Sequence, residues 1–179
     1  RVFGVVPPRK SMPISGRCET SGMIDPAGEP KIYLETNFFI RAVEGTLEAA
    51  GPPRQLIDLL KRRAGIAVTS EITFAEVLAP PKRPDALPLQ IKRRAYLDLL
   101  LWSGFIELVP VSRSILMETA DVRTVSRLKL PDAIHLVSAI QHRCGYFVSA
   151  DRDFNRLPGG MVRLDPDDDG LSALFERLA

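Results

Sequence analysis

The stretch LPDAIHLVSAIQHRCGYFVSADRDF, residues 130–154, predicts one complete helix–strand unit. Pro131 and Asp132 are typical of a helix start, because proline fits the first helical position and the helix dipole stabilises a carboxylate there. Apolar residues continue the helix, which is expected to end at Gly145, and a short apolar strand follows and stops at Asp151. Asp132 and Asp151 therefore lie at a helix N-terminus and a strand C-terminus, two places that face the same crevice in α/β proteins.

The rest of the chain from residue 31 alternates strands with helices. Further strands are predicted at KIYLE (31–35), IAVTS (66–70), FIELVPV (105–111) and MVRLD (161–165). Helices are predicted at FFIRAVEG (38–45), PPRQLIDLLKRRAG (52–65), EITFAEVLA (71–79), QIKRRAYLDLLLWSG (90–104), SRSILMETADVRTVSRL (112–128) and LSALFERLA (171–179). Ser70 is expected to cap the third of these helices, and Ile91, Ala95, Leu99 and Trp102 are expected to share one side of the fourth. The alternation predicts an α/β fold with a mostly parallel sheet covered on both faces.

The composition is that of an ordinary globular domain. The chain has 179 residues, of which 45% are hydrophobic and 26% are charged, and this length favours a single domain with its own core. No apolar run reaches the ~18 residues of a membrane span. The two cysteines, Cys18 and Cys144, are too few for a disulfide framework. We therefore expect a cytoplasmic protein that does not enter a membrane.

Residues 1–30 differ from the remainder. They contain Pro7, Pro8, Pro13, Pro26 and Pro30 and show neither a helical nor a strand period. We expect this segment to be a disordered or extended leader, and residues 31–179 to form the domain. Because the chain begins with Arg, we further hypothesise that its functional start lies near Met23.

The net charge is only +2, but the cations are grouped. Three basic clusters occur at residues 61–63, 82–83 and 92–94. Each cluster taken alone is most simply a solvated helix face or loop end. Together they would also suit a polyanionic substrate, which needs cations around a metal centre.

Four acids are predicted near one edge of the sheet. Glu35 ends the first strand and Asp151 ends the fourth, Asp132 begins a helix, and Glu76 lies about one turn into the helix after the second strand. Each has a simpler explanation alone: a helix start for Asp132, a turn for Asp151, an exposed helix position for Glu76. An unpaired buried acid at Glu35 would be costly, however. Since carboxyl ends of parallel strands share one edge, the four acids are expected to meet.

Clustered carboxylates repel one another and are stabilised by a cation. An oxygen-only ligand set without cysteine suits Mg²⁺ or Mn²⁺ better than Zn²⁺. His135 lies three residues after Asp132 on the same helical side and is a further candidate ligand, although a single helical histidine is more often structural. The residues thus predict a site for a divalent metal.

Four segments in order, YLETNFFI (33–40), TSEITFAEVL (69–78), LPDAIHLVSAI (130–140) and FVSADRDF (147–154), resemble PIN-domain ribonucleases, most closely the VapC toxins of toxin–antitoxin pairs. The resemblance covers about residues 31–165. It implies a PIN-like three-layer α/β/α fold, Mg²⁺- or Mn²⁺-dependent cleavage of RNA, a small cognate antitoxin as partner and a homodimer. It places the catalytic, metal-binding acids on Glu35, Glu76, Asp132 and Asp151, and supporting polar residues on Thr36, Asn37 and Asp153.

One position departs from the family, which almost always carries Asp where this chain has Glu35. The added methylene moves the carboxylate by about 1.5 Å, one C–C bond, and Mg²⁺ tolerates misplaced ligands poorly. We expect retained activity because the other three acids are intact. The alternative is a catalytically impaired PIN module that binds RNA or a protein partner. A phosphatase-like metalloenzyme is less well supported, because Glu35 occupies the place of its usual nucleophilic Asp.

Overall fold

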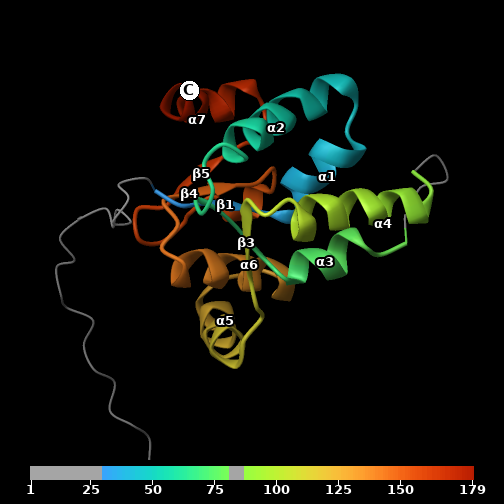
Figure 1. The fold of residues 1–179 in the computed structure, drawn as a ribbon. Helices are drawn as coiled ribbons and strands as arrows, with labels where there is room; N and C mark the ends of the chain where they lie inside the picture. Colours follow the sequence, from blue (N-terminus) through green and yellow to red (C-terminus); the bar gives the residue numbers. More distant parts are fainter. Residues whose placement is uncertain (1–29, 81–86) are drawn as a thin grey trace, which may run out of the picture.

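The computed structural model describes residues 30–80 and 87–179 (Figure 1). At its centre lies a five-stranded sheet in which all neighbouring strands are parallel, in the order β3-β2-β1-β4-β5. The strands are β1 (Ile32–Leu34), β2 (Ala67–Ser70), β3 (Ile106–Val109), β4 (Tyr146–Val148) and β5 (Val162–Leu164). The predicted leader at residues 1–30 lies, apart from Pro30, outside the described residues.

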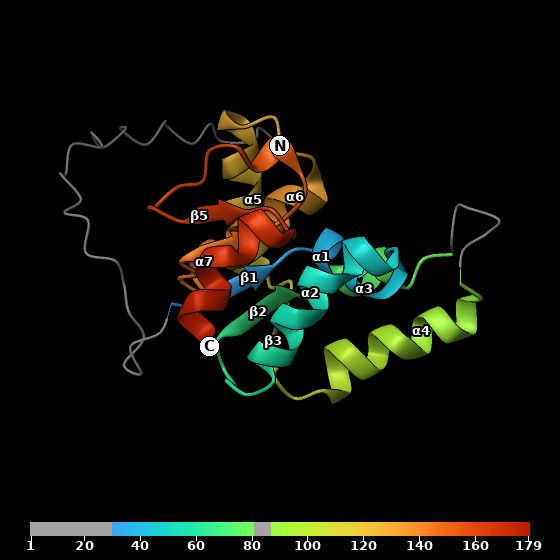
Figure 2. The ribbon, with the colours of Figure 1, turned by 90° about the horizontal axis from the view of Figure 1, so that it is seen from above.

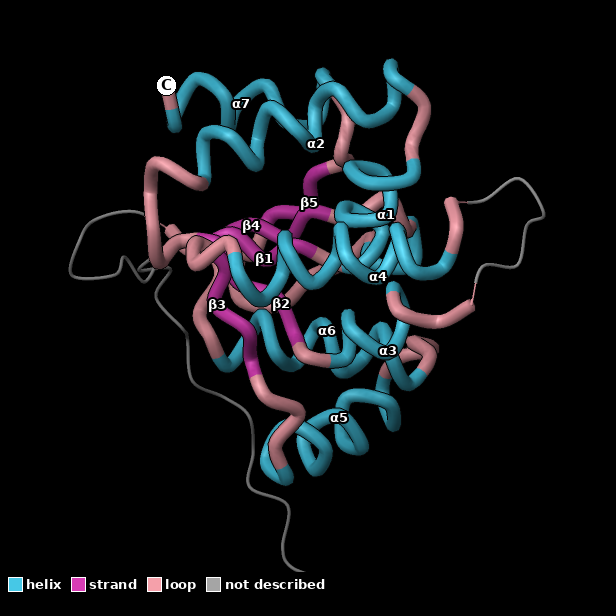
Figure 3. Tube along the Cα trace, turned by 45° about the vertical axis from the view of Figure 1, so that its right-hand side comes forward, coloured by secondary structure: helices cyan, strands magenta, loops and turns pink. Residues whose placement is uncertain are grey.

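Helices cover both faces of this sheet. Those of the described residues are α1 (Thr36–Glu44), α2 (Leu47–Leu60), α3 (Ile72–Val77), α4 (Leu89–Leu97), the π-helix η1 (Asp98–Trp102), α5 (Arg113–Val125), α6 (Leu130–Gln141), the 3₁₀-helix η2 (Arg152–Phe154) and α7 (Asp168–Leu178). Helices α1, α2 and α7 lie over one face, and α5 and α6 lie under the other (Figure 3). The predicted three-layer α/β/α fold is therefore confirmed.

The central strand β1 is apolar on both faces, as a parallel strand between two helical layers requires. Successive side chains of a strand point to opposite faces. Leu34 accordingly packs with Phe38 and Leu56 in the core under α1 and α2. Tyr33 packs with Phe147 on the α6 side, with ring centroids 5.0 Å apart. Burial of β1 on both sides fixes the position of its last residue and of Glu35 after it.

The chain leaves β1 towards β2 on one side of the sheet and returns to β4 on the other. The switch point of the topology thus lies between β1 and β4, where open α/β sheets form a crevice at the carboxyl ends of the strands. Leu34 is paired with Val148, and the Glu35 backbone N–H still donates to the Val148 carbonyl at 3.1 Å. Glu35 therefore enters the switch point in a fixed backbone position.

Several predicted ends differ from the structure. Strand β4 ends at Val148, so Ser149 and Ala150 separate it from Asp151, and α6 ends at Gln141 instead of Gly145. Ser70 is the last residue of β2, and the N-cap position of α3 is Glu71, whose side chain makes no cap hydrogen bond. The Ser70 hydroxyl instead accepts the Ile72 N–H at 3.4 Å. Turn hydrogen bonds of this kind are not visible in hydrophobic periodicity.

The four apolar residues expected to share one side of the fourth helix do not form its buried side. Ile91 and Trp102 are 58% and 55% exposed, whereas Lys92 and Tyr96 are buried. The Lys92 ammonium lies 3.1 Å from the Glu44 carboxylate, and the Tyr96 hydroxyl donates to the same oxygen at 2.6 Å. This lysine is buried because an acid on α1 meets it, a tertiary contact that periodicity cannot show. The π-turn η1 then shifts the register of the last residues, and Figure 2 shows α4 lying at the side of the sheet.

Within residues 30–80 and 87–179, no helix has the length and apolar character that crossing a membrane requires. Cys144 is a buried free thiol.

Candidate metal centre

Glu35 directly follows β1 and is the N-cap residue of α1. Its side chain is almost fully buried: one carboxylate oxygen, Oε2, accepts the Asn37 N–H at 3.0 Å and the Ser149 hydroxyl at 3.1 Å. Burial raises the pKa of Glu35, and His135 and these two hydrogen bonds only partly offset that effect. The site thus contains a buried acid that is held by neutral donors.

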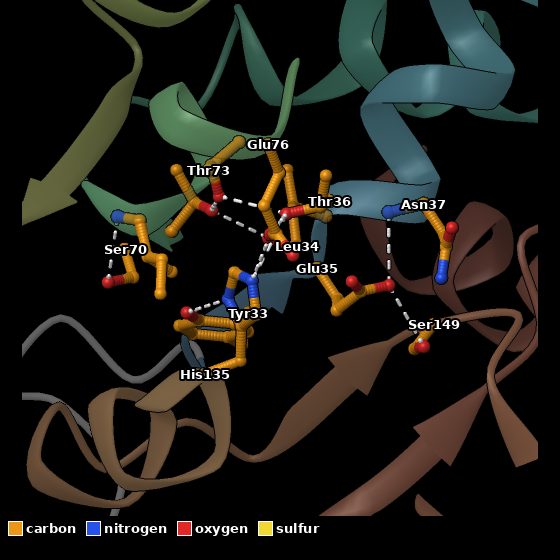
Figure 4. A network of polar contacts seen from close by, with 12 residues as sticks. Tyr33, Leu34, Glu35, Thr36, Asn37, Ser70, Thr73, Glu76, His135 and Ser149 are labelled. Carbon is orange, nitrogen blue, oxygen red and sulfur yellow. Dashed lines mark hydrogen bonds and ion pairs between the residues drawn. The ribbon is translucent and has the colours of Figure 1, made fainter. Parts of the chain in front are cut away.

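Glu76 lies in α3 and reaches the same region from the other side (Figure 4). Its Oε2 accepts a hydrogen bond from the Thr36 hydroxyl at 2.5 Å and another from His135 Nε2 at 2.9 Å. Partial burial alone would raise the pKa of Glu76, but the hydrogen bonds from His135 and Thr36 outweigh burial and lower it. Glu76 is therefore held as a carboxylate.

Three aspartates form a second set. Asp132 lies in the first turn of α6, and Asp151 follows β4 and caps η2 by accepting the Asp153 N–H at 2.8 Å. One oxygen from each of Asp132, Asp151 and Asp153 lies within 4.8 Å of the others. Burial and the nearby Asp151 carboxylate raise the pKa of Asp132, whereas Lys129 and His135 lower it.

The structure thus arranges the predicted acids in two neighbouring groups. The glutamate group is Glu35, Glu76 and His135, and the aspartate group is Asp132, Asp151 and Asp153; in each, the donor atoms lie within 4.8 Å of one another. Helix α6 carries a member of each group, Asp132 and His135, one turn apart. The pKa of Asp132 depends on Asp151 and also on Glu76, so the two groups are electrostatically coupled.

The donor atoms fit a hard divalent cation. The carboxylate oxygens are ligands that Mg²⁺ and Mn²⁺ prefer. The Asp132 Oδ2 is buried and has no hydrogen-bond partner among the described residues, which is costly for a carboxylate oxygen unless a cation meets it. None of the ion pairs of the described residues joins Glu35, Glu76, Asp132 or Asp151 to a lysine or arginine. That these four acids bind a metal remains a prediction, and the arrangement is compatible with it.

The predicted supporting residues occupy distinct places. Thr36 is buried and donates to Glu76, Asn37 holds Glu35 through its backbone N–H, and Asp153 is exposed beside Asp151. The sequence reasoning missed Ser149, which is fully buried. Its hydroxyl donates to Glu35 and accepts the Asp151 N–H at 2.9 Å, so it links the two strand ends. A small polar residue two positions before Asp151 was the signal that could have found it.

The two basic clusters that lie within the described residues are not arranged around the acids. Residues 61–63 follow α2 and precede β2, so they lie at the amino end of that strand, away from the carboxyl edge. Residues 82–83 lie outside the described part of the chain. In the third cluster, Lys92 is buried against Glu44 and Arg94 pairs with Asp98 at 2.9 Å. In the sequence, Lys129 precedes α6 and Arg152 directly follows Asp151, and both are exposed. Arg163 also lies near Asp151, because its guanidinium donates to the Ser149 and Asp151 carbonyls, but it is paired with Asp165.

The family model described as PIN domain matches residues 32–160. Among solved structures, a chain of a toxin–antitoxin complex from Klebsiella pneumoniae has 25% sequence identity and a TM-score of 0.55, over 76% of this chain and 98% of that one. A chain of VapBC2 from Rickettsia felis bound to a promoter DNA fragment has 20% identity and a TM-score of 0.55, over 75% and 98%. A chain of FitAcB from Neisseria gonorrhoeae has 16% identity and a TM-score of 0.53, over 75% and 97%.

The two relatives below 25% identity share the fold with this chain. No curated protein matches its sequence. The PIN-domain match, in contrast, extends from the first residue of β1 to beyond η2 and includes every acid of both groups. With the parallel sheet and its switch point, this match shows that the chain belongs to the PIN-domain family.

Proposed function

We propose that this protein is a divalent-metal-dependent endoribonuclease and the toxin of a toxin–antitoxin pair. The observation that carries the proposal is that Glu35, Glu76, Asp132 and Asp151 lie in two electrostatically coupled groups, with no ion pair to lysine or arginine among the described residues. Membership of the PIN-domain family supports nuclease activity. The Klebsiella pneumoniae structure is of a toxin–antitoxin complex, which supports an antitoxin partner.

Glu35, Glu76, Asp132 and Asp151 would hold Mg²⁺ or Mn²⁺. When bound, the cation offsets the repulsion of the carboxylates and polarises the phosphodiester. The protein supplies orientation: Asn37 and Ser149 hold one oxygen of Glu35 before any substrate binds, and Thr36 and His135 hold one oxygen of Glu76. Ligands fixed in this way lose little freedom when the metal binds.

RNA would approach over the amino end of α6 and the carboxyl end of β4. Lys129 lies three residues before Asp132 and Arg152 directly after Asp151; both are exposed, and Lys129 lowers the pKa of Asp132 through its charge. Cations beside an acidic metal centre can bind the phosphates that flank the cleaved bond. We therefore assign the phosphate contacts to Lys129 and Arg152 and not to the clusters at residues 61–63 and 92–94.

The test is cleavage of structured and unstructured RNA by the purified protein with Mg²⁺, with Mn²⁺ and with a chelator. We expect cleavage that needs the metal and is lost in Asp132→Asn, which removes one charge and keeps the shape of the side chain. Equal cleavage by wild type and Asp132→Asn would overturn the proposed site.

The toxin role has a separate test. Exposed apolar side chains on α4, η1 and α5, among them Ile91, Trp102 and Met117, would supply surface for the proposed antitoxin and homodimer contacts. Expression of the chain alone is expected to arrest growth, and co-expression of a small protein encoded next to it is expected to restore growth and co-purify. Unimpaired growth with a catalytically active protein would contradict the toxin role and leave the nuclease assignment standing.

A second candidate function is a PIN module with impaired catalysis that binds RNA or a protein. The observation that favours it is the burial of Glu35, which is only 4% exposed and has one oxygen fully used by Asn37 and Ser149. RNA binding without cleavage, in Mg²⁺ and in Mn²⁺, would support this second function.

A further inference from the structure

A series of hydrogen bonds links Tyr33 of β1, His135 of α6 and Glu76 of α3 (Figure 4). The Tyr33 hydroxyl lies 2.8 Å from His135 Nδ1. His135 Nε2 lies 2.9 Å from Glu76 Oε2 and 3.1 Å from the Thr36 hydroxyl. His135 and Tyr33 are both completely buried, so neither side chain can exchange these partners for water.

The direction of each hydrogen bond follows from the chemistry of its ends. An ionised carboxylate only accepts hydrogen bonds, so His135 must carry a proton on Nε2 and donate it to Glu76. Burial raises the pKa of the Tyr33 hydroxyl well above its ordinary value, so this group keeps its proton. An imidazole whose one proton is on Nε2 has a bare Nδ1, which can accept the hydrogen bond from the Tyr33 hydroxyl.

This arrangement decides between two roles for His135. A metal ligand must present a bare ring nitrogen to the ion. Here Nε2 is directed at Glu76 and Nδ1 at Tyr33, so neither nitrogen is free to bind a metal. A histidine that donates to a ligating carboxylate instead fixes the direction of that carboxylate.

We propose that His135, with its tautomer set by Tyr33, is a positioning residue that fixes Glu76 for metal binding. The inference rests on the proposed function, because it takes Glu76 as a metal ligand. It adds a residue pair that acts on the metal without touching it. His135 orients one oxygen of Glu76, and the other oxygen remains for the cation.

The experiment measures the Kd for Mn²⁺ from the electron paramagnetic resonance signal of the free ion. We expect about tenfold weaker binding in His135→Leu, the usual effect of losing a hydrogen-bond partner of a ligand. His135→Gln can place an amide N–H near the position of Nε2 and is expected to stay within about threefold of wild type. His142→Gln changes the other histidine, at the far end of α6, and is the matched control with unchanged affinity.

Tyr33→Phe keeps the shape of the core and removes only the hydroxyl, so it tests the tautomer in a protein that still folds. We expect about threefold weaker Mn²⁺ binding. Without the Tyr33 hydroxyl as donor, the imidazole can carry its proton on Nδ1, and Nε2 is then bare and cannot donate to Glu76. Long-range ¹H–¹⁵N spectra of the metal-free wild type should show His135 protonated on Nε2 and bare on Nδ1. A proton on Nδ1 alone would overturn the proposal.

The outcomes separate this inference from the proposed function. If wild type binds Mn²⁺ and cleaves RNA while His135→Leu and Tyr33→Phe bind equally well, the positioning role is wrong and the nuclease stands. If wild type binds Mn²⁺ but cleaves no RNA, the nuclease is wrong and the Kd values alone decide the positioning role. If wild type binds no Mn²⁺, both proposals are wrong.

Discussion

Acidic side chains at the two ends of the sheet differ in whether they have ion-pair partners. At the carboxyl end, Glu35, Glu76, Asp132 and Asp151 lie in two coupled groups without an ion pair to lysine or arginine among the described residues. Near the amino end, Glu107 of β3 is paired twice: Lys31 Nζ lies 2.9 Å from Oε2, and His142 Nδ1 lies 3.1 Å from Oε1.

This difference appears in the direction of the pKa shifts. Burial would raise the pKa of Glu107, but Lys31 and His142 outweigh burial and lower it. At the carboxyl end burial prevails for Glu35 and for Asp132, and the pKa of each is raised. Glu76 is the exception at the carboxyl end, because His135 and Thr36 lower its pKa. The Glu107 pairs therefore contribute stability to the apoprotein, whereas the charges of Glu35 and Asp132 are unfavourable and can be relieved by a cation. Acids with raised pKa values at one edge of a sheet are typical of a functional site.

The largest expected effect is the loss of RNA cleavage when an acid at the carboxyl end, and not one at the amino end, is neutralised. Asp132→Asn should lower the rate of RNA cleavage by at least about 100-fold, because it removes a charge from the metal centre. It should leave the melting temperature of the apoprotein unchanged or higher, since it relieves repulsion with Asp151. Glu107→Gln should do the reverse, with normal cleavage and a lower melting temperature. Equal effects of the two changes on cleavage would contradict the comparison.

Metal binding should stabilise the folded protein through the carboxyl end alone. At 100 times its Kd, Mn²⁺ is expected to add about 2.7 kcal/mol to the free energy of unfolding. For a chain of this length that corresponds to an increase in melting temperature of about 5–10 °C. Thermal unfolding with and without Mn²⁺ measures this shift, which should persist in Glu107→Gln. A shift of the same size in Asp132→Asn would show that the ion binds elsewhere.

Glu35→Asp tests whether RNA cleavage by this protein requires the longer side chain of glutamate at position 35. The shorter side chain would withdraw the carboxylate by about 1.5 Å, one C–C bond, from the Asn37 N–H and the Ser149 hydroxyl that hold Glu35. We expect about tenfold lower cleavage, equivalent to the loss of one strong hydrogen bond. Ser149→Ala removes one donor and leaves Glu35 in place, and it should give a smaller loss in the same assay. A large gain in cleavage by Glu35→Asp would favour the impaired module instead.

The smallest expected effect is the acid dependence of stability at the amino end. The pKa of Glu107 is lowered in the folded protein, so its contribution to stability is fully present above the ordinary pKa of a glutamate and is lost as the pH falls through the lowered value. Because Glu107 is partly exposed, this contribution is at most about 1 kcal/mol. The difference in urea midpoint between wild type and Glu107→Gln should be present at pH 7 and vanish below that lowered pKa. A difference that persists in acid would show that packing, and not charge, is involved.

The fold class and the sheet edge at which Glu35 and Asp151 lie follow from the pattern of apolar strands and helices alone. Apolar β1, β2 and β4 alternating with helices can only be buried as a parallel sheet between helical layers. In such a sheet the residues after β1 and β4 share one edge, so Glu35 and Asp151 were brought to the same crevice by topology alone. The position of Asp132 in the first turn of α6 followed from local helix-start chemistry.

Which side chains contact these acids depends on how distant segments of the chain pack together. Ser149 contacts Glu35 across 114 residues of sequence, and His135 contacts Tyr33 across 102 and Glu76 across 59. Periodicity reports which side of an element is apolar, but it contains no information about which polar atoms face each other across packed elements. The same reason explains the burial of Lys92 against Glu44, and the division of the acids into a glutamate group and an aspartate group.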